Sequence, residues 1–236
     1  NNGPVLDVTP EQLASQIEIL NEDFNRFGRG FNTDSVGASV NIRFCLATRD
    51  PDGNPSVGYD LVNYPATFGH NPFVEGVDEA MKQLAVWDVD RYLNIYIVRQ
   101  ISNGQTSGYA YLPEDAAGTV FDGIVVDYRQ VGRFEGTAVA LGHTVAHEVG
   151  HYLDLYHPWG LEAGPCGFND DFCGDTPEVE AEFYASFPGC IGPASCDLVP
   201  RQVANFMDYS DDRCLNLFTE CQSLRKRKAV LNFRSQ

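Results

Sequence analysis

Three of the five histidines of this 236-residue chain, His147, His151 and His157, lie in one short segment. His147 and His151 are four residues apart, so on a helix both imidazoles project from one face and can reach the same ion. Neutral imidazole is a common zinc ligand, and this spacing is a recognised zinc-site geometry. Glu148 would lie about 100° around the helix from His147, close enough to contact a metal-bound water without binding the metal.

The third histidine needs a reversal of the chain. On a straight helix His157 would lie about 9 Å beyond His151, too far to reach the same ion. The helix must therefore end and turn back at a residue that tolerates left-handed backbone, for which glycine is the usual choice. Asp154 stands three residues after His151, and Asp is among the few other residues enriched in that conformation. We expect Asp154 to adopt it and His157 to complete the site.

Three protein ligands would leave one zinc position open for water, which is typical of a catalytic site. Zinc can lower the pKa of that water to about 7, and Glu148 would take its proton as the hydroxide attacks a peptide carbonyl. In this composition the full pattern has a chance expectation on the order of one in ten thousand. His143, four residues before His147, is expected to be exposed or capping rather than a fourth ligand, and His70 structural or on the surface.

Two alternatives remain open. A glutamate could replace the third histidine, and Glu178, Glu180 and Glu182 are spaced plausibly for this. The chain could also be an inactive, metal-stabilised extracellular binding module. The presence of Glu148 favours an enzyme, because a binding protein has no need of a general base there.

Composition and charge exclude several classes of protein. The hydrophobic content of 43%, the charged content of 21% and the length fit a globular protein of one domain or two joined subdomains. The net charge of −17 argues against nucleic-acid binding, and no apolar run is long enough to cross a bilayer. The one basic cluster, residues 225–228, is expected to be a solvated helix face. The start at Asn1 is typical of a processed mature protein, which we expect to be a monomer that acts on proteins or peptides.

Seven cysteines predict an oxidising environment. Six of them lie between positions 166 and 221, without the Cys-x-x-Cys pairs of a zinc ribbon, so disulfides are a better interpretation than a thiolate metal site. Disulfides indicate export, and hence a secreted protein. The seventh, Cys45, falls in an expected strand and could be a buried thiol or a partner of one of the six.

The elements that must position these residues can be placed along the chain. Thr9, Pro10 and Gln12 predict a helix start with a capping box, followed by an apolar stripe at Leu13, Ile17, Leu20, Phe24 and Phe27. Strands are expected at residues 39–48, 92–98, 107–112 and 122–127, and further helices at 136–156 and 218–233. Between about 157 and 218 Gly, Pro, Asp and Cys predominate, which predicts irregular structure held by cross-links. The expected fold is therefore α+β.

The motifs together resemble a known family. The histidine pattern is similar to that of the metzincins, which have a methionine turn downstream, and residues 205–209 (Asn-Phe-Met-Asp-Tyr) offer one. His-Glu-Val-Gly-His, Asp-Thr-Pro at 175–177 and Phe-Thr at 218–219 resemble the pappalysins, and their ulilysin-like members in particular. The resemblance covers most of the chain. One departure matters: Asp154 stands where the family has glycine.

The resemblance implies an endopeptidase made as a zymogen, with Met207 under the zinc site and Tyr209 bonded to the tetrahedral intermediate. A twisted mixed sheet with backing and active-site helices would form an upper subdomain at residues 1–157. An irregular, disulfide-bonded lower subdomain with the C-terminal helix would occupy 158–236. Substrate would add to an exposed sheet edge, here residues 107–112. The resemblance and the acidic charge favour a basic residue after the scissile bond.

Two further features follow from the same resemblance. Structural calcium is implied near an oxygen-rich stretch suited to a hard cation, with the candidate ligands Asn169, Asp170, Asp171, Gly174 and Thr176. The implied disulfides are Cys166–Cys196 and Cys190–Cys214, which leave Cys45, Cys173 and Cys221 without an assigned pairing.

Overall fold

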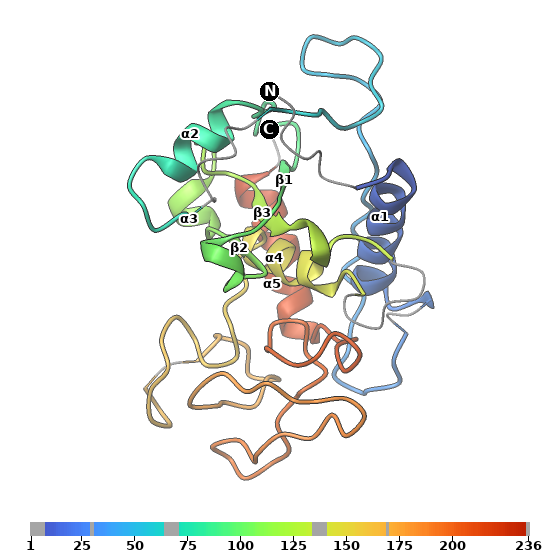
Figure 1. Cartoon of the computed structure of the whole chain (residues 1–236). Helices are drawn as coiled ribbons and strands as arrows, with labels where there is room; N and C mark the ends of the chain where they lie inside the picture. The colour runs from blue at the N-terminus through green and yellow to red at the C-terminus, as the bar shows by residue number, and fades with distance from the viewer. Residues whose placement is uncertain (1–7, 29–30, 64–70, 134–140, 169, 235–236) are drawn as a thin grey trace.

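A computed structural model describes residues 8–28, 31–63, 71–133, 141–168 and 170–234 (Figure 1). It confirms the α+β class, with short strands among helices and a long irregular region. The helices are α1 (Pro10–Asn25), α2 (Val77–Gln83), α3 (Pro113–Ala116), α4 (His143–Tyr152) and α5 (Glu220–Phe233). The strands are β1 (Ile95–Val98), β2 (Gly108–Ala110) and β3 (Ile124–Asp127). Among the described residues, no helix is long and apolar enough to cross a membrane.

The sheet is small and mixed. Its strand order is β1-β3-β2, with β1 parallel and β2 antiparallel to β3. All three strands lie within ranges predicted from alternation, and β2 lies at an edge as expected. All four residues of β3 are buried, because α4 packs against β2 and β3 and also contacts α1. The sheet therefore provides a floor for the helix that carries His147 and His151.

Helix α1 begins as its sequence predicts. Thr9 and Gln12 form the reciprocal capping box, and Pro10 occupies the first turn. Leu20 and Phe24 are fully buried. Phe27, expected at the end of the apolar stripe, is instead 51% exposed, because the helix stops at Asn25 and Arg26 turns left-handed with φ 56°.

The strand predicted at 39–48 is absent from these residues, although the segment runs alongside α1. Its backbone is bonded by side chains of the helix rather than by a neighbouring strand. Asn21 both donates to the Phe44 carbonyl and accepts from the Phe44 amide, and Asn25 donates to the Ile42 carbonyl. Side-chain amides thus satisfy an extended segment whose alternation is that of a strand.

One continuous core joins both halves of the chain. Phe24 contacts Phe218 edge-on at 5.0 Å, and Phe218 lies 4.7 Å from Phe206, measured between ring centroids. Val145 and Val149 of α4 pack in the same cluster. The expected division into residues 1–157 and 158–236 stays a prediction.

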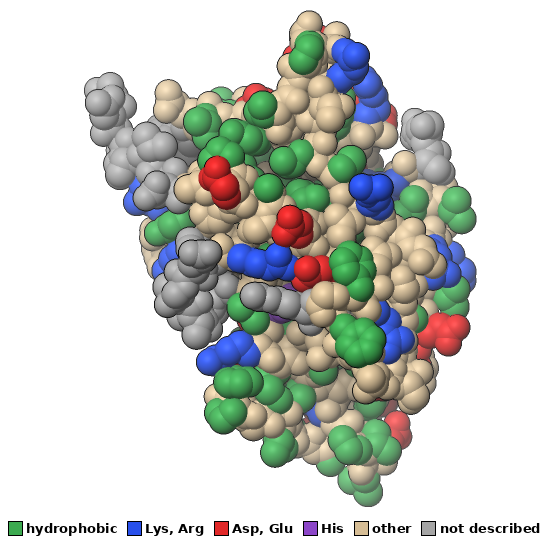
Figure 2. Space-filling model, turned by 90° about the vertical axis from the view of Figure 1, so that its right-hand side faces the viewer, with side chains coloured by type: hydrophobic (Ala, Val, Ile, Leu, Met, Phe, Trp, Pro, Cys, Tyr) green, Lys and Arg blue, Asp and Glu red, His purple; other side chains and the backbone are tan. Residues whose placement is uncertain are grey.

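Residues 158–168 and 170–218 form loops at the lower end of the molecule (Figure 1). Several of their large hydrophobic side chains are exposed, among them Leu161, Tyr184, Ile191 and Leu198. On the face drawn in Figure 2, hydrophobic side chains gather at this lower end, and acidic and basic ones are interspersed above it. Cross-links supplement the core here, as expected for a loop-rich region.

The structure contains the two disulfides that the resemblance implies, together with one more. The three pairs are Cys166–Cys196, Cys190–Cys214 and Cys173–Cys221. Cys45 is exposed and unpaired, so both interpretations of it as a buried thiol or a disulfide partner were wrong. Cys45 faces away from its neighbour Phe44, which packs against the core.

The prediction that the basic cluster at residues 225–228 forms a solvated helix face was wrong. Lys226 is completely buried, with its amine over the rings of Phe24 and Phe218. Arg225 and Arg227 are partly buried and donate to backbone carbonyls. Of the four, only Lys228 is exposed, because one face of α5 packs against the core while Leu224, Lys228 and Leu231 lie on its exposed face.

Candidate metal centre

The structure brings His147, His151 and His157 together. Their Nε2 atoms lie 3.1–3.2 Å from one another. Zinc–nitrogen bonds of about 2.0–2.1 Å in tetrahedral geometry place ligand nitrogens about 3.3 Å apart. The three side chains are therefore spaced as the ligands of one zinc ion.

The turn after α4 makes this convergence possible. Asp154 has φ 71°, the left-handed conformation expected of it. The Leu155 amide donates to the Gly150 carbonyl and the Asp154 amide to the His151 carbonyl, both at 3.0 Å. This is the bond pair of a Schellman motif, with Asp154 in the position that glycine usually takes. The chain then reverses and carries His157 back to the other two histidines.

Backbone carbonyls orient two of the three imidazoles. The Nδ1 of His147 lies 2.7 Å from the Phe206 carbonyl, and that of His151 lies 2.8 Å from the Leu155 carbonyl. A carbonyl can only accept, so each Nδ1 carries the proton and each Nε2 presents its lone pair to the centre. Burial lowers the pKa of His147 to about 3 and that of His151 to about 4, and lowers that of His157 further. The cluster is thus neutral and ready to bind a cation.

Glu148 lies beside this cluster. It is 5% exposed, and burial raises the pKa of its carboxyl to about 8. Its Oε2 is buried without a hydrogen-bond partner among the described residues. The side chain passes next to Gly108 of β2, where an added Cβ would lie 2.9 Å from its Cγ and Oε1. A buried carboxyl with a vacant oxygen suits proton transfer at the metal.

Met207 and Tyr209 flank the histidines, as the resemblance implies. Met207 is fully buried, and its sulfur packs against Gly150 so closely that a Cβ there would collide with it. The Tyr209 ring lies 4.9 Å from that of His157. Burial first, and then the charges of Glu148 and Glu182, raise the pKa of the Tyr209 phenol above its usual range, so its hydroxyl stays protonated and able to donate.

Three contributions were not found from the sequence. Trp159 stacks on His157, Arg201 bonds the Asp208 carboxylate through both Nε and Nη2, and Gly108 leaves room for Glu148. Only Gly108 had a local signal, because a glycine within a strand pattern indicates close approach of a neighbour. The other two depend on contacts across the loop-rich region.

His143 is neither exposed nor a cap, contrary to the prediction. It is 3% exposed, and its Nδ1 lies 2.8 Å from Oδ2 of Asp23 on α1. The residue before it, Gly142, is the N-cap. Packing of α1 against α4 buries this end of the helix and pairs the imidazole there. His70 lies outside the described residues.

The alternative glutamates are engaged elsewhere. Glu178 accepts from the Gly167 amide and Glu180 from the Cys166 amide, while Glu182 is exposed. In the described part of the chain, the histidine group that could hold a metal contains none of them. The geometry therefore favours His157 as third ligand.

The candidate calcium residues lie in a loop beside α5. Asp171 is 4% exposed, and burial raises its carboxyl pKa to about 7. Asp170 is exposed and accepts from the Phe172 amide. Gly174 is exposed and Thr176 partly buried. Asn169 lies outside the described residues.

Comparison with known proteins identifies the family. The family model described as pregnancy-associated plasma protein-A, peptidase family M43, matches residues 76–231. An extracellular metalloprotease of Neurospora crassa is 33% identical over 203 residues, covering 82% of this chain and 67% of the relative. Extracellular metalloprotease 1 of Coccidioides posadasii is 30% identical over 236 residues, covering 97% and 71%.

Solved structures agree with this relationship. Mature mirolysin of Tannerella forsythia, in complex with a cleaved peptide, matches with a TM-score of 0.80 and 32% identity over 96% of this chain and 86% of that one. A mutant of promirolysin matches with a TM-score of 0.82 and 31% identity over 100% and 79%. The family, the fold and the disulfides agree: the chain belongs to the pappalysin family of ulilysin-like metzincins and is an extracellular zinc metalloendopeptidase.

Proposed function

We propose that His147, His151 and His157 hold the zinc of this endopeptidase and that Glu148 is its general base. The observation that carries the proposal is the convergence of three Nε2 lone pairs within 3.2 Å, beside a buried carboxyl. A bound zinc ion would supply Lewis-acid polarisation of the scissile carbonyl and of a water molecule. Beside the bound cation, the carboxylate form of Glu148 would be favoured over the protonated form that burial alone favours. Glu148 would then accept the proton of the attacking water through Oε2 and deliver it to the leaving amine.

Tyr209 is proposed to donate to the oxygen of the tetrahedral intermediate. Its ring lies 5.6 Å from that of His147 and 4.9 Å from that of His157, and the raised pKa keeps its proton in place. Met207 supports the histidines from below, through its contact with Gly150. Both roles follow the family resemblance.

The substrate is proposed to pair with β2. This strand bonds β3 on one side and is an edge of the sheet, and Gly108 brings it next to Glu148. A peptide added there as a strand would pass the histidine cluster. Exposed Glu182 near Tyr209 and the net charge of −17 support a preference for a basic residue after the scissile bond.

A structural calcium ion is proposed at the loop with Asp170, Asp171, Gly174 and Thr176, together with Asn169. Asp175 in the same loop has a buried Oδ1 without a hydrogen-bond partner, which a hard cation would satisfy. Calcium should raise the melting temperature of the wild-type protein and not that of Asp171→Asn. Equal effects on both would contradict this site. Synthesis as a zymogen is proposed from the resemblance.

Casein digestion and zinc content together test the catalytic proposal. A chelator should abolish digestion, and Glu148→Gln should abolish it while one zinc per chain remains bound, because Glu148 is not a ligand. Glu11→Gln, at an exposed position on α1, is the matched control and should keep activity. His157→Ala should lose zinc, and retention of tight zinc by that variant would overturn the assignment. Cleavage of a proteome-derived peptide library would test the basic preference.

A further inference from the structure

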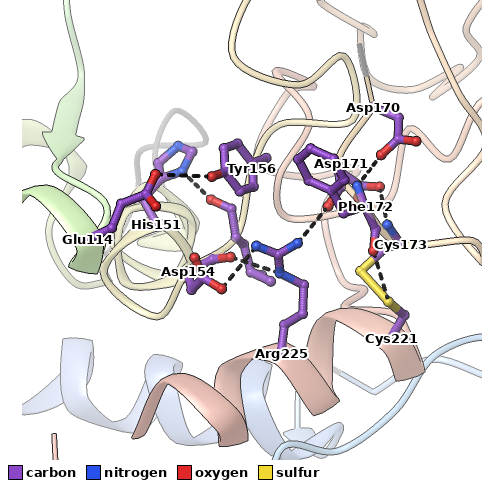
Figure 3. A network of polar contacts seen from close by, with 11 residues as sticks. Glu114, His151, Asp154, Tyr156, Asp170, Asp171, Phe172, Cys173, Cys221 and Arg225 are labelled. Carbon is purple, nitrogen blue, oxygen red and sulfur yellow. Dashed lines mark hydrogen bonds and ion pairs between the residues drawn. A yellow bond between two sulfur atoms is a disulfide. The ribbon is translucent and has the colours of Figure 1, made fainter. Parts of the chain in front are cut away.

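Arg225 of α5 reaches the turn that follows α4 (Figure 3). Its Nε donates to the Asp154 carbonyl at 3.0 Å, and its Nη2 bonds Oδ2 of the Asp154 carboxylate, also at 3.0 Å. The side chains of Arg225 and Asp154 are 19% and 30% exposed. The guanidinium therefore bonds both the backbone and the side chain of the residue that adopts the left-handed conformation at this turn.

The same guanidinium is itself held in place. Its Nη1 donates to the Asp171 carbonyl at 3.3 Å, and the rings of Tyr156 and Phe172 lie 5.1 and 5.8 Å from its central carbon. The loop at 171–173 is tied to α5 by the Cys173–Cys221 disulfide. Cys221 stands one helical turn before Arg225, on the same face of α5. These contacts hold the Arg225 guanidinium in place while it bonds Asp154.

The turn at Asp154 affects the position of two of the three histidines, His151 and His157. Leu155, the next residue, offers the carbonyl that orients His151. His157 follows three residues after Asp154 and reaches the cluster only because the chain reverses there. A shift of this turn would move the partner of one ligand and the backbone of another.

We propose that Arg225 is a positioning residue for the zinc site: it holds the left-handed Asp154 turn so that Leu155 and His157 keep their places in the histidine cluster. The inference rests on the proposed zinc site and adds a residue of α5 to it. A glycine at this position would form the turn without help from a side chain. Here the aspartate supplies a carboxylate, and Arg225 uses it to stabilise the backbone conformation.

The test measures zinc affinity by competition with a chromogenic chelator. Arg225→Met should weaken zinc binding about tenfold, within the range seen when residues behind metal ligands are replaced. It should lower kcat with little change in KM, because the substrate strand is not touched. Lys228→Met, an exposed position on the same helix, removes the same charge and should leave both quantities unchanged. Arg225→Lys should restore affinity only in part, because an ammonium cannot make the forked contact.

The Arg225→Met substitution is then repeated in an Asp154→Gly variant, in which glycine forms the left-handed turn readily. There, Arg225→Met should weaken zinc binding by threefold or less, because the bond to the carboxylate is already lost. An equal loss in both backgrounds, or an Arg225→Met affinity equal to that of Lys228→Met, would overturn the inference. Circular dichroism of the metal-free variants checks their folding. If wild-type protein binds zinc through His157 and Arg225→Met binds it equally well, only the inference fails and the proposed zinc site stands.

Discussion

The indole of Trp159 lies flat against the imidazole of His157, with ring centroids 4.6 Å apart and planes inclined by 8°. Trp159 is 5% exposed and also meets the Tyr209 ring at 4.9 Å. The other two histidines are oriented through Nδ1 by carbonyls, whereas the stack fixes the ring plane of His157. This contact joins the proposed third ligand to the loop-rich region.

Replacing Trp159 should therefore weaken zinc binding. Trp159→Leu removes the flat surface, and we expect zinc affinity to fall about tenfold, while Trp159→Phe keeps part of the stack and should lose less. Chelator competition measures both. Trp87→Phe is the control, because the Trp87 indole donates to Asp60 and, within the described residues, does not contact the three clustered histidines. Equal affinities for Trp159→Leu and the wild type would contradict this role.

The contact of Met207 with Gly150 should make position 150 intolerant of any side chain. Gly150→Ala would push a methyl group into the Met207 sulfur, and overpacking of this kind costs about 1–3 kcal/mol. Urea unfolding of the metal-free protein measures the loss. Gly189→Ala is the control, because a Cβ there meets only the Ser186 carbonyl at 3.7 Å. In a Met207→Ala background the penalty should largely disappear, and a penalty of full size there would contradict the collision.

The zinc cluster could be predicted from the sequence because its spacing encodes its geometry. Positions 147 and 151 share a helix face, and the need to bring back His157 identifies Asp154 as the turning residue. The carbonyls that orient the rings could not be predicted. Those of Phe206 and Leu155 carry no side-chain signature, since any residue has a carbonyl. Trp159 and Arg225 were missed for a different reason: their side chains reach the site only through tertiary contacts, which local spacing does not reveal.

The fold shows the same limit. Alternation identified three strands, but it also predicted a fourth at 39–48, where Asn21 and Asn25 provide the hydrogen bonds instead. Periodicity reports which side chains face inwards and not what the backbone pairs with. A cluster of four basic residues looked solvated, although Lys226 is completely buried. Composition could not reveal that Lys226 lies on the face of α5 that packs against the core.

The close approach of Gly108 and Glu148 should make catalysis sensitive to a single methyl group. In Gly108→Ala the new Cβ would lie 2.9 Å from the Glu148 carboxylate, so the flexible side chain must move. Misplacement of a catalytic group by about 1 Å costs on the order of 10²-fold in rate, and we expect kcat to fall by that amount. Zinc affinity should not change, because Glu148 is not among the three proposed ligands. Unchanged zinc affinity and circular dichroism of Gly108→Ala would assign the loss to Glu148, and a loss of either would assign it to the strand instead.

Burial of Lys226 predicts a specific dependence of stability on pH. Its pKa is lowered well below the usual value by complete burial, which outweighs the opposing charge of Asp23. The unfolded chain binds the proton up to about pH 10.4, whereas the folded chain releases it at lower pH. Stability should therefore rise with pH between the two pKa values, by up to about 1.4 kcal/mol per unit. Lys226→Met should remove this contribution and flatten the curve.

Urea unfolding of the metal-free protein from pH 6 to 9 tests this prediction. Other groups also titrate in this range, including Glu148, so the decisive quantity is the difference between variant and wild type. That difference should favour Lys226→Met most at pH 6 and shrink steadily towards pH 9. Lys228→Met, at the exposed position two residues on, should follow the wild-type curve throughout. Parallel curves for Lys226→Met and the wild type would mean that Lys226 keeps its proton in the folded state, held by the rings of Phe24 and Phe218.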